Sequence, residues 1–152
     1  MLRVRACAAA AALCLLQDAP LDGSWELTRI FRPGAAPATR PIPVDSTVYL
    51  RVTLESHQGG WISGRLYRRY RGAEEHAKIE GGLLRGPGPS RYILGADLER
   101  PASAKARTAA WLVGDTLRLG TSFVPDADSL ELRRVAPDAP YPATVLEVVT
   151  PR

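Results

Sequence analysis

The stretch LDGSWELTRI, residues 21–30, decides the fold, because its Gly-x-Trp opens a first β-strand that the other strands follow. We expect this strand over residues 24–31 and its antiparallel partner near the far end of the chain, over 129–135. By the strand period of two, the side chains that share the inner face are Trp25, Leu27, Arg29 and Phe31 in the first strand and Leu130, Leu132 and Arg134 in the last. The two strands are expected to close a small barrel.

The composition describes one domain without a strongly charged surface. The chain has 152 residues, and its 13 glycines and 13 prolines suit many short strands joined by turns. The net charge is +4, and Lys78 and Lys105 are the only lysines, so arginine supplies nearly all of the positive charge. A charge this small, spread over the chain, gives no support to a nucleic-acid partner, and we expect none.

Residues 1–19 have the pattern of a secretory signal peptide. Arg3 and Arg5 give a positive start, and residues 6–16 form an apolar run shorter than the roughly 20 residues that a bilayer-spanning helix needs. A buried N-terminal helix is the alternative. Both cysteines lie in this segment, so we expect a secreted or periplasmic protein without a thiol. Lipidation at Cys14, and with it contact with a membrane surface, is a minor alternative.

Six further strands are expected between the first and the last. The clearest covers residues 47–56, where apolar and polar side chains alternate as in a half-buried antiparallel strand. Residues 32–45 carry four prolines, which remove ladder donors, so we expect a long loop there. Gly114-Asp115 is a two-residue hairpin signal. The other strands are expected over 61–71, 75–84, 91–98, 105–113 and 116–122.

This pattern predicts an all-β fold, an eight-stranded antiparallel up-and-down barrel over residues 20–135. An open β-sandwich is the alternative that the same pattern permits. The tail, residues 136–152, is expected to pack on the barrel as an extra strand or a short helix. The longer connections share one end of the barrel: 32–46, 71–74, 99–104 and 123–128. That end is therefore expected to be an open mouth, with the proline-rich loop as a lid.

Gly23-Ser24-Trp25, eight strands and a terminal Leu130-Glu131-Leu132-Arg133-Arg134 together resemble the lipocalin-like (calycin) barrels. That family opens with Gly-x-Trp and carries an arginine at the end of its last strand, packed across the tryptophan. The resemblance implies a divergent, exported bacterial member that binds a small molecule in its barrel. It also implies a structural stack of Gly23, Trp25 and Arg134 at the closed end. Since Trp25 and Arg134 share the inner parity, their cation–π contact would contribute about 1 kcal/mol.

A ligand in such a barrel would be held by the mouth and the inner wall. Side chains near the mouth on the inner parity would give an apolar pocket a few polar handles. The alternative is that large side chains simply fill a small barrel. The candidate ligand-binding residues are Arg29, Phe31, Leu50, Val52, Leu66, Tyr70, Leu94 and Leu98.

The arginine-rich run over residues 65–71 is expected to lie on a solvated outer wall, since its side chains divide between the two faces of the strand. An anionic headgroup or polysaccharide bound near Arg69 and Arg71 is the functional alternative.

The sequence shows no catalytic constellation, and we expect a protein that is not an enzyme. His57 and His76 are expected at the surface. Asp126 and Asp128 share a loop, but two carboxylates without an EF-hand-like frame are usually solvated turn residues, with calcium as the alternative. Nucleophile elbows, phosphate loops and zinc-binding histidine pairs are absent from the sequence. We therefore expect no catalytic residue, no resident metal and no cofactor.

Two functions from different classes remain. The first is an exported monomer that holds a small hydrophobic or amphiphilic molecule in its barrel. The second is a filled-barrel interaction protein, such as an envelope component or a protease inhibitor, without a small-molecule ligand. A continuous cavity above about 300 Å³ would favour the first, and a filled core the second.

Overall fold

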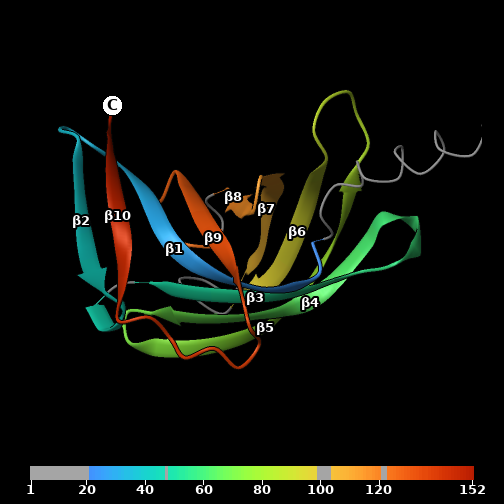
Figure 1. Cartoon of the computed structure of the whole chain (residues 1–152), viewed down its shortest axis with the longest axis horizontal. Coiled ribbons are helices and arrows are strands. Elements are labelled where there is room, and N and C mark those ends of the chain that lie inside the picture. Colours follow the sequence, from blue (N-terminus) through green and yellow to red (C-terminus); the bar gives the residue numbers. More distant parts are fainter. Residues whose placement is uncertain (1–20, 47, 99–103, 121–122) are drawn as a thin grey trace, which may run out of the picture.

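The computed structural model describes residues 21–46, 48–98, 104–120 and 123–152, so the segment expected to be a signal peptide lies outside the described residues. The regular secondary structure of the described chain is almost entirely β-strand (Figure 1). The strands are β1 (Gly23–Gly34), β2 (Ala38–Pro43), β3 (Tyr49–Ser56), β4 (Trp61–Tyr70), β5 (Ala73–Leu84), β6 (Arg91–Leu98), β7 (Ala104–Val113), β8 (Thr116–Leu119), β9 (Ser129–Val135) and β10 (Thr144–Pro151). Two 3₁₀ turns, η2 (Val44–Ser46) and η3 (Gln58–Gly60), precede β3 and β4.

Eight of these strands form a closed barrel. They pair antiparallel in the order β1-β3-β4-β5-β6-β7-β8-β9, and β9 returns to pair with β1. This ring confirms the predicted eight-stranded antiparallel barrel and excludes the open β-sandwich. The β7–β8 hairpin turns at Gly114-Asp115 as predicted, with Val113 paired to Thr116.

β1 is longer than the barrel needs, and its two halves have different neighbours on one edge. Residues Gly23–Glu26 pair with β3, whereas Arg29–Gly34 pair in parallel with β10. β10 then pairs antiparallel with β2, so β2 and β10 form a two-stranded wing beside the barrel (Figure 1). Of the two alternatives for the tail, the structure shows the extra strand.

The loop expected over residues 32–45 is a wrong prediction, because β1 continues to Gly34 and β2 follows it. β2 is the outermost strand of the sheet, with β10 as its one neighbour. Pro41 and Pro43 are two residues apart, so their nitrogen atoms face the same edge, and an edge strand tolerates proline where no donor is needed. The prolines therefore leave the strand intact and weaken its free edge as a template for pairing with another chain.

A β-bulge in β1 changes which side chains face the interior. The register against β9 shifts between Leu27 and Arg29, and Thr28 has no paired residue there. Trp25 and Leu27 face inward, but after the bulge Ile30 takes the inner position and is fully buried. The expected inward positions of Arg29 and Phe31 are therefore wrong, and Arg29 is exposed beside Glu131 at 3.6 Å.

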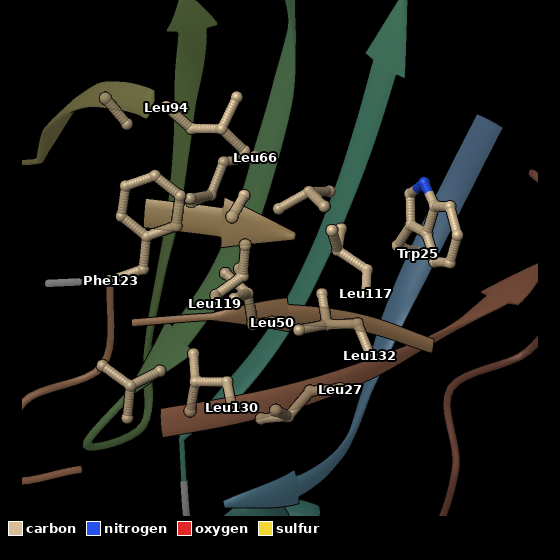
Figure 2. Packing of buried hydrophobic residues seen from close by; sticks show 14 of the residues in the cluster. Trp25, Leu27, Leu50, Leu66, Leu94, Leu117, Leu119, Phe123, Leu130 and Leu132 are labelled. Atoms are coloured by element: carbon tan, nitrogen blue, oxygen red, sulfur yellow. The ribbon is translucent and has the colours of Figure 1, made fainter. Parts of the chain in front are cut away.

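The core lies inside the barrel and draws on all eight of its strands. Figure 2 shows apolar side chains from facing walls meeting in the interior, among them Trp25, Leu50, Leu94 and Leu132. Among the described residues, no helix has the length and apolar character needed to cross a membrane.

Candidate functional site

The inner wall that was expected to bind a ligand is packed against other side chains. Leu50, Val52 and Leu94 are 0% exposed, Leu66 is 1% and Leu98 is 4% exposed. A cavity large enough for a ligand would leave the side chains that line it accessible. These residues therefore form part of the apolar core, as Figure 2 shows for Leu50, Leu66 and Leu94.

The loop between β8 and β9, expected to be part of an open mouth, closes that end of the barrel. Phe123 and Val124 are both 0% exposed, and Phe123 points into the interior in Figure 2. The backbone N–H of Asp128 donates to the Phe31 carbonyl at 2.7 Å and ties the end of the loop to β1. The loop therefore acts as a plug. Sequence patterns do not reveal it, because connections between strands are usually expected to lie on the surface.

A buried ion pair lies beneath this plug. Arg68 on β4 is 0% exposed, pairs with Glu75 on β5 and donates from Nη1 to the Phe123 carbonyl at 3.1 Å. Placing the arginine run on a solvated outer wall is thus wrong for Arg68, which shares the inner parity of Ile62 and Leu66. Its parity and its cross-strand position opposite Glu75 are signals that could have located the pair.

A cleft of about 290 Å³ lies where the wing meets the plugged end of the barrel, and we call it the mouth cleft. Glu147 on β10 accepts ion pairs from Arg32 on β1 at 3.6 Å and from Arg40 on β2 at 3.2 Å. Arg32 Nη1 also contacts the carbonyls of Pro125 and Asp126 in the plug at 3.4 and 3.3 Å. The polar lining consists mainly of Arg32, Arg40, Tyr70, Arg71, Asp126 and Glu147. Of the predicted ligand-binding residues, Tyr70 is the one among these.

Backbone strain is concentrated at this cleft. Within the described part of the chain, Arg71 (φ 50°) and Asp126 (φ 61°) are the non-glycine residues with positive φ, and both line the cleft. Arg71 and Gly72 (φ 77°) are the two central residues of the β4–β5 hairpin turn, since Tyr70 pairs with Ala73. Such turns favour Asn-Gly, and arginine there adopts an unfavourable conformation. Strained residues cluster at functional sites, which makes the mouth cleft a candidate.

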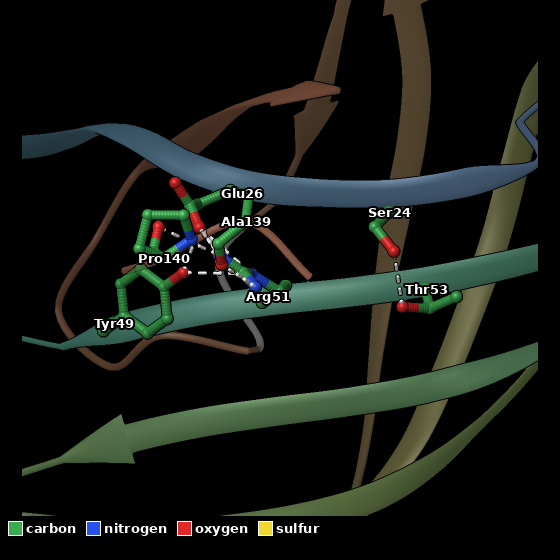
Figure 3. A network of polar contacts seen from close by, with 7 residues as sticks. All are labelled: Ser24, Glu26, Tyr49, Arg51, Thr53, Ala139 and Pro140. Atoms are coloured by element: carbon green, nitrogen blue, oxygen red, sulfur yellow. Dashed lines mark hydrogen bonds and ion pairs between the residues drawn. The ribbon is translucent and has the colours of Figure 1, made fainter. Parts of the chain in front are cut away.

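Aromatic and charged side chains hold the tail on the outer face of the barrel. Tyr141 stacks on Tyr67 with ring centroids 5.2 Å apart and meets Tyr49 edge-on at 4.8 Å. Arg51 pairs with Glu26 and donates to the Ala139 carbonyl at 2.8 Å (Figure 3).

Tyr49 also donates to Glu26 in this network. Burial raises the pKa of the Tyr49 hydroxyl, and the hydrogen bond to the Glu26 carboxylate raises it further. The tail therefore covers a side chain that strand parity places on the outer face.

The closed end holds the stack that the resemblance implies. The Arg134 guanidinium lies 4.4 Å from the Trp25 ring centroid and donates to the Asp22 carbonyl. Trp25 Nε1 donates to the Leu21 carbonyl at 2.8 Å. Gly23 has a φ of 120°, and a Cβ there would lie 2.7 Å from Arg134 Nη1. The backbone conformation thus favours glycine at this position, and a larger residue would also displace the Arg134 guanidinium.

The outer wall carries two depressions. One, of about 590 Å³, lies over β3–β5 between polar side chains, and the other, of about 330 Å³, over β4–β7. Trp61, Leu83 and Leu84 line the smaller one and are 49%, 39% and 49% exposed. This depression is the main exposed apolar feature of the described surface.

The histidines and the loop aspartates contact neighbouring side chains. His57 Nε2 lies 2.7 Å from Ser63 Oγ, and the His76 ring lies 5.0 Å from Tyr67. The Asp128 carboxylate accepts a hydrogen bond from Thr150 Oγ1 at 3.3 Å, whereas Asp126 lines the mouth cleft. Among the residues the structure describes, no group of three or more histidine, cysteine, aspartate or glutamate side chains has the arrangement of a metal site.

Comparison of the chain with family models, with curated proteins and with solved structures gives no significant match. The closed antiparallel barrel is compatible with a calycin-like fold.

Proposed function

We propose that this protein is a filled-barrel interaction protein, a divergent relative of the lipocalin-like barrels that works through its outer surface. The observation that supports this proposal is the packing of the inner wall. Leu50, Val52 and Leu94 are inaccessible to water, and Phe123 and Val124 occupy the end through which a ligand would enter. Filling a small eight-stranded barrel with side chains is physically ordinary.

Further expectations accompany the proposal. The pattern over residues 1–19 supports export to the periplasm or the medium, with lipidation at Cys14 as the minor alternative. The proline-bearing free edge of β2 supports a monomer, because it offers little to a second chain. The sequence supports neither catalysis nor nucleic-acid binding.

Native mass spectrometry of the full-length chain, expressed in a bacterial host, tests the proposal. We expect the folded protein to carry no small-molecule adduct, and the wild type to show no saturable binding of benzene. A stoichiometric adduct that is released on denaturation would overturn the filled-barrel proposal in favour of a carrier. The same spectra give the mass of the mature chain and hence the cleavage site and the state of Cys14.

Leu94→Ala is the matched control for that experiment. It removes a fully buried side chain and should leave an apolar cavity, of the kind that stays dry and admits benzene. Benzene binding by Leu94→Ala, together with none by the wild type, would show that the assay detects an empty core. Equal binding by both proteins would indicate that the wild-type barrel already has room, which contradicts the proposal.

A further inference from the structure

The geometry of the mouth cleft points to a binding site for a phosphate monoester, and we propose this as a second property of the protein. The inference goes beyond the filled-barrel proposal, because the cleft lies outside the barrel core. Its volume of about 290 Å³ is at the lower limit of small-molecule sites, which fits a small phosphate ester or a phosphorylated headgroup.

The charges of the cleft favour an anion. Three arginines, Arg32, Arg40 and Arg71, face two carboxylates, Glu147 and Asp126. Glu147 is shared by Arg32 and Arg40 and holds both guanidinium groups in place at the junction of the wing with the barrel. Among the described residues, no carboxylate forms an ion pair with Arg71. The cleft is thus left with one positive charge that is not balanced by an acidic side chain.

Arg71 is held in position for a ligand. Its guanidinium carbon lies 5.3 Å from the centroid of the Tyr70 ring, and that of the buried Arg68 lies 5.3 Å from the same centroid. Tyr70 is therefore fixed between a buried ion pair and the cleft, and it orients Arg71 in turn. Asparagine would fit this turn position with less strain than arginine. The presence of a strained arginine therefore points to a function for its guanidinium group.

A tetrahedral oxyanion suits this arrangement. Phosphate oxygens accept bidentate hydrogen bonds from guanidinium groups, and a phosphate can accept them from several directions at once. Arg40 and Arg71 lie on separate elements, so they could bind the phosphate from different sides. The Tyr70 side chain also lines the cleft, and the ester part would face Ile42 and Val48. The Asp126 carboxylate repels the anion and so limits its affinity.

Two substitutions to asparagine test the site with opposite signs. Asn tolerates positive φ, so both Arg71→Asn and Asp126→Asn should fold, and the first should raise Tm by about 3 °C because it relieves strain. Arg71→Asn removes charged hydrogen-bond donors and should weaken binding about tenfold or more. Asp126→Asn removes the repelling charge and should strengthen it several-fold. Arg65→Gln, on the outer face of β4, is the control for a change of charge outside the cleft.

Isothermal titration calorimetry with inorganic phosphate and glycerol 3-phosphate measures these affinities, and thermal melts confirm that each variant is folded. Vesicles of phosphatidic acid, compared with vesicles of phosphatidylcholine, distinguish a lipid headgroup from a soluble ester. Binding to the vesicles or to the soluble phosphates that is lost in Arg71→Asn supports the site. Equal weakening by Arg71→Asn and Arg65→Gln would overturn it, since binding would then reflect diffuse positive charge. Absence of binding to all the phosphate-bearing probes at millimolar concentration would overturn it as well.

Discussion

The stack at the closed end leads to a prediction for which the structure supplies the magnitudes. Arg134→Ala removes a cation–π contact at 4.4 Å from Trp25 and the hydrogen bond to the Asp22 carbonyl. Each contributes about 1 kcal/mol at this partly exposed site, so the variant should lose about 2 kcal/mol of unfolding free energy. For a chain of this length, that loss corresponds to a decrease in Tm of about 6 °C.

A double-mutant cycle isolates the part that belongs to the contact. Trp25→Leu keeps an apolar side chain at a position that is 1% exposed but removes the aromatic face, so it is less disruptive than alanine. The summed losses of unfolding free energy in the two single variants should exceed the loss in the double variant by about 1 kcal/mol. Urea unfolding followed by far-ultraviolet circular dichroism measures all four proteins.

Arg133→Ala is the control for this cycle, since Arg133 is an exposed neighbour on the opposite parity of β9, and its change should stay within about 0.5 kcal/mol. Strict additivity of Trp25→Leu and Arg134→Ala would refute the reasoning, because it would mean that the stack contributes nothing to the closure of β1 against β9.

Three further predictions concern the plug, the buried ion pair and the tail network. Phe123→Ala should lose about 3–5 kcal/mol in urea unfolding, as for a large core side chain, whereas a loss below about 1 kcal/mol would show that the plug is not part of the core. Glu75→Gln leaves the Arg68 charge buried without its carboxylate, so the unfolding free energy should decrease by about 3–5 kcal/mol. Adding Arg68→Met to this variant should restore most of that stability, and a double variant that stays as unstable as Glu75→Gln would contradict this account. Because the pKa of Tyr49 is raised, the folded protein keeps this hydroxyl proton above about pH 10, whereas the unfolded chain releases it. The contribution of Tyr49 to stability is therefore full below that pH, and the unfolding free energy decreases by up to about 1.4 kcal/mol per pH unit above it. Urea titrations between about pH 9 and pH 11 should show a shallower decrease for Tyr49→Phe, and equal slopes would count against the buried bond to Glu26.

The barrel itself could be predicted because its signals are local. Alternating side chains and short turns define each strand, and strands that follow one another along the chain pair as neighbours. The stack could be anticipated for a related reason. Trp25 precedes the bulge in β1, and β9, which carries Arg134, has no extra residue of its own, so counting by two places both correctly.

Other features depend on information that a local pattern does not carry. The bulge at Thr28 adds one residue without any change in composition, so the count by two fails for Arg29 and Phe31. The prolines of β2 predict a loop, because proline usually interrupts a strand, although an edge position accepts it. The division of the arginine run between the two strand faces favours a solvated wall, but it does not show that Arg68 is the inward member, whose burial Glu75 and the Phe123 carbonyl make tolerable.

The mouth cleft was the hardest feature to foresee. Its lining comes from β1, β2, β4, β10 and three connections, and these elements meet through the parallel pairing of β10 with β1. No pattern within a strand indicates that a tail strand joins this edge. The expectation of an anion near Arg71 rested on charge alone, and the wing supplies the neighbouring groups that give the position a shape.

The branching of β1 also sets the order in which the molecule can be assembled. Thr150 Oγ1 donates to the Arg32 carbonyl at 3.3 Å across 118 residues of chain, and β9 reaches β1 from nearly as far along the sequence. Proteins dominated by such non-local pairs have high contact order and fold slowly, because loop-closure entropy is lost before any contact is gained. β1 thus emerges before the other barrel strands and is completed only after β9 and β10 have formed. Until β9 and β10 have formed, the edges of β1 lack these partners, and this interval is when a chaperone has most to protect.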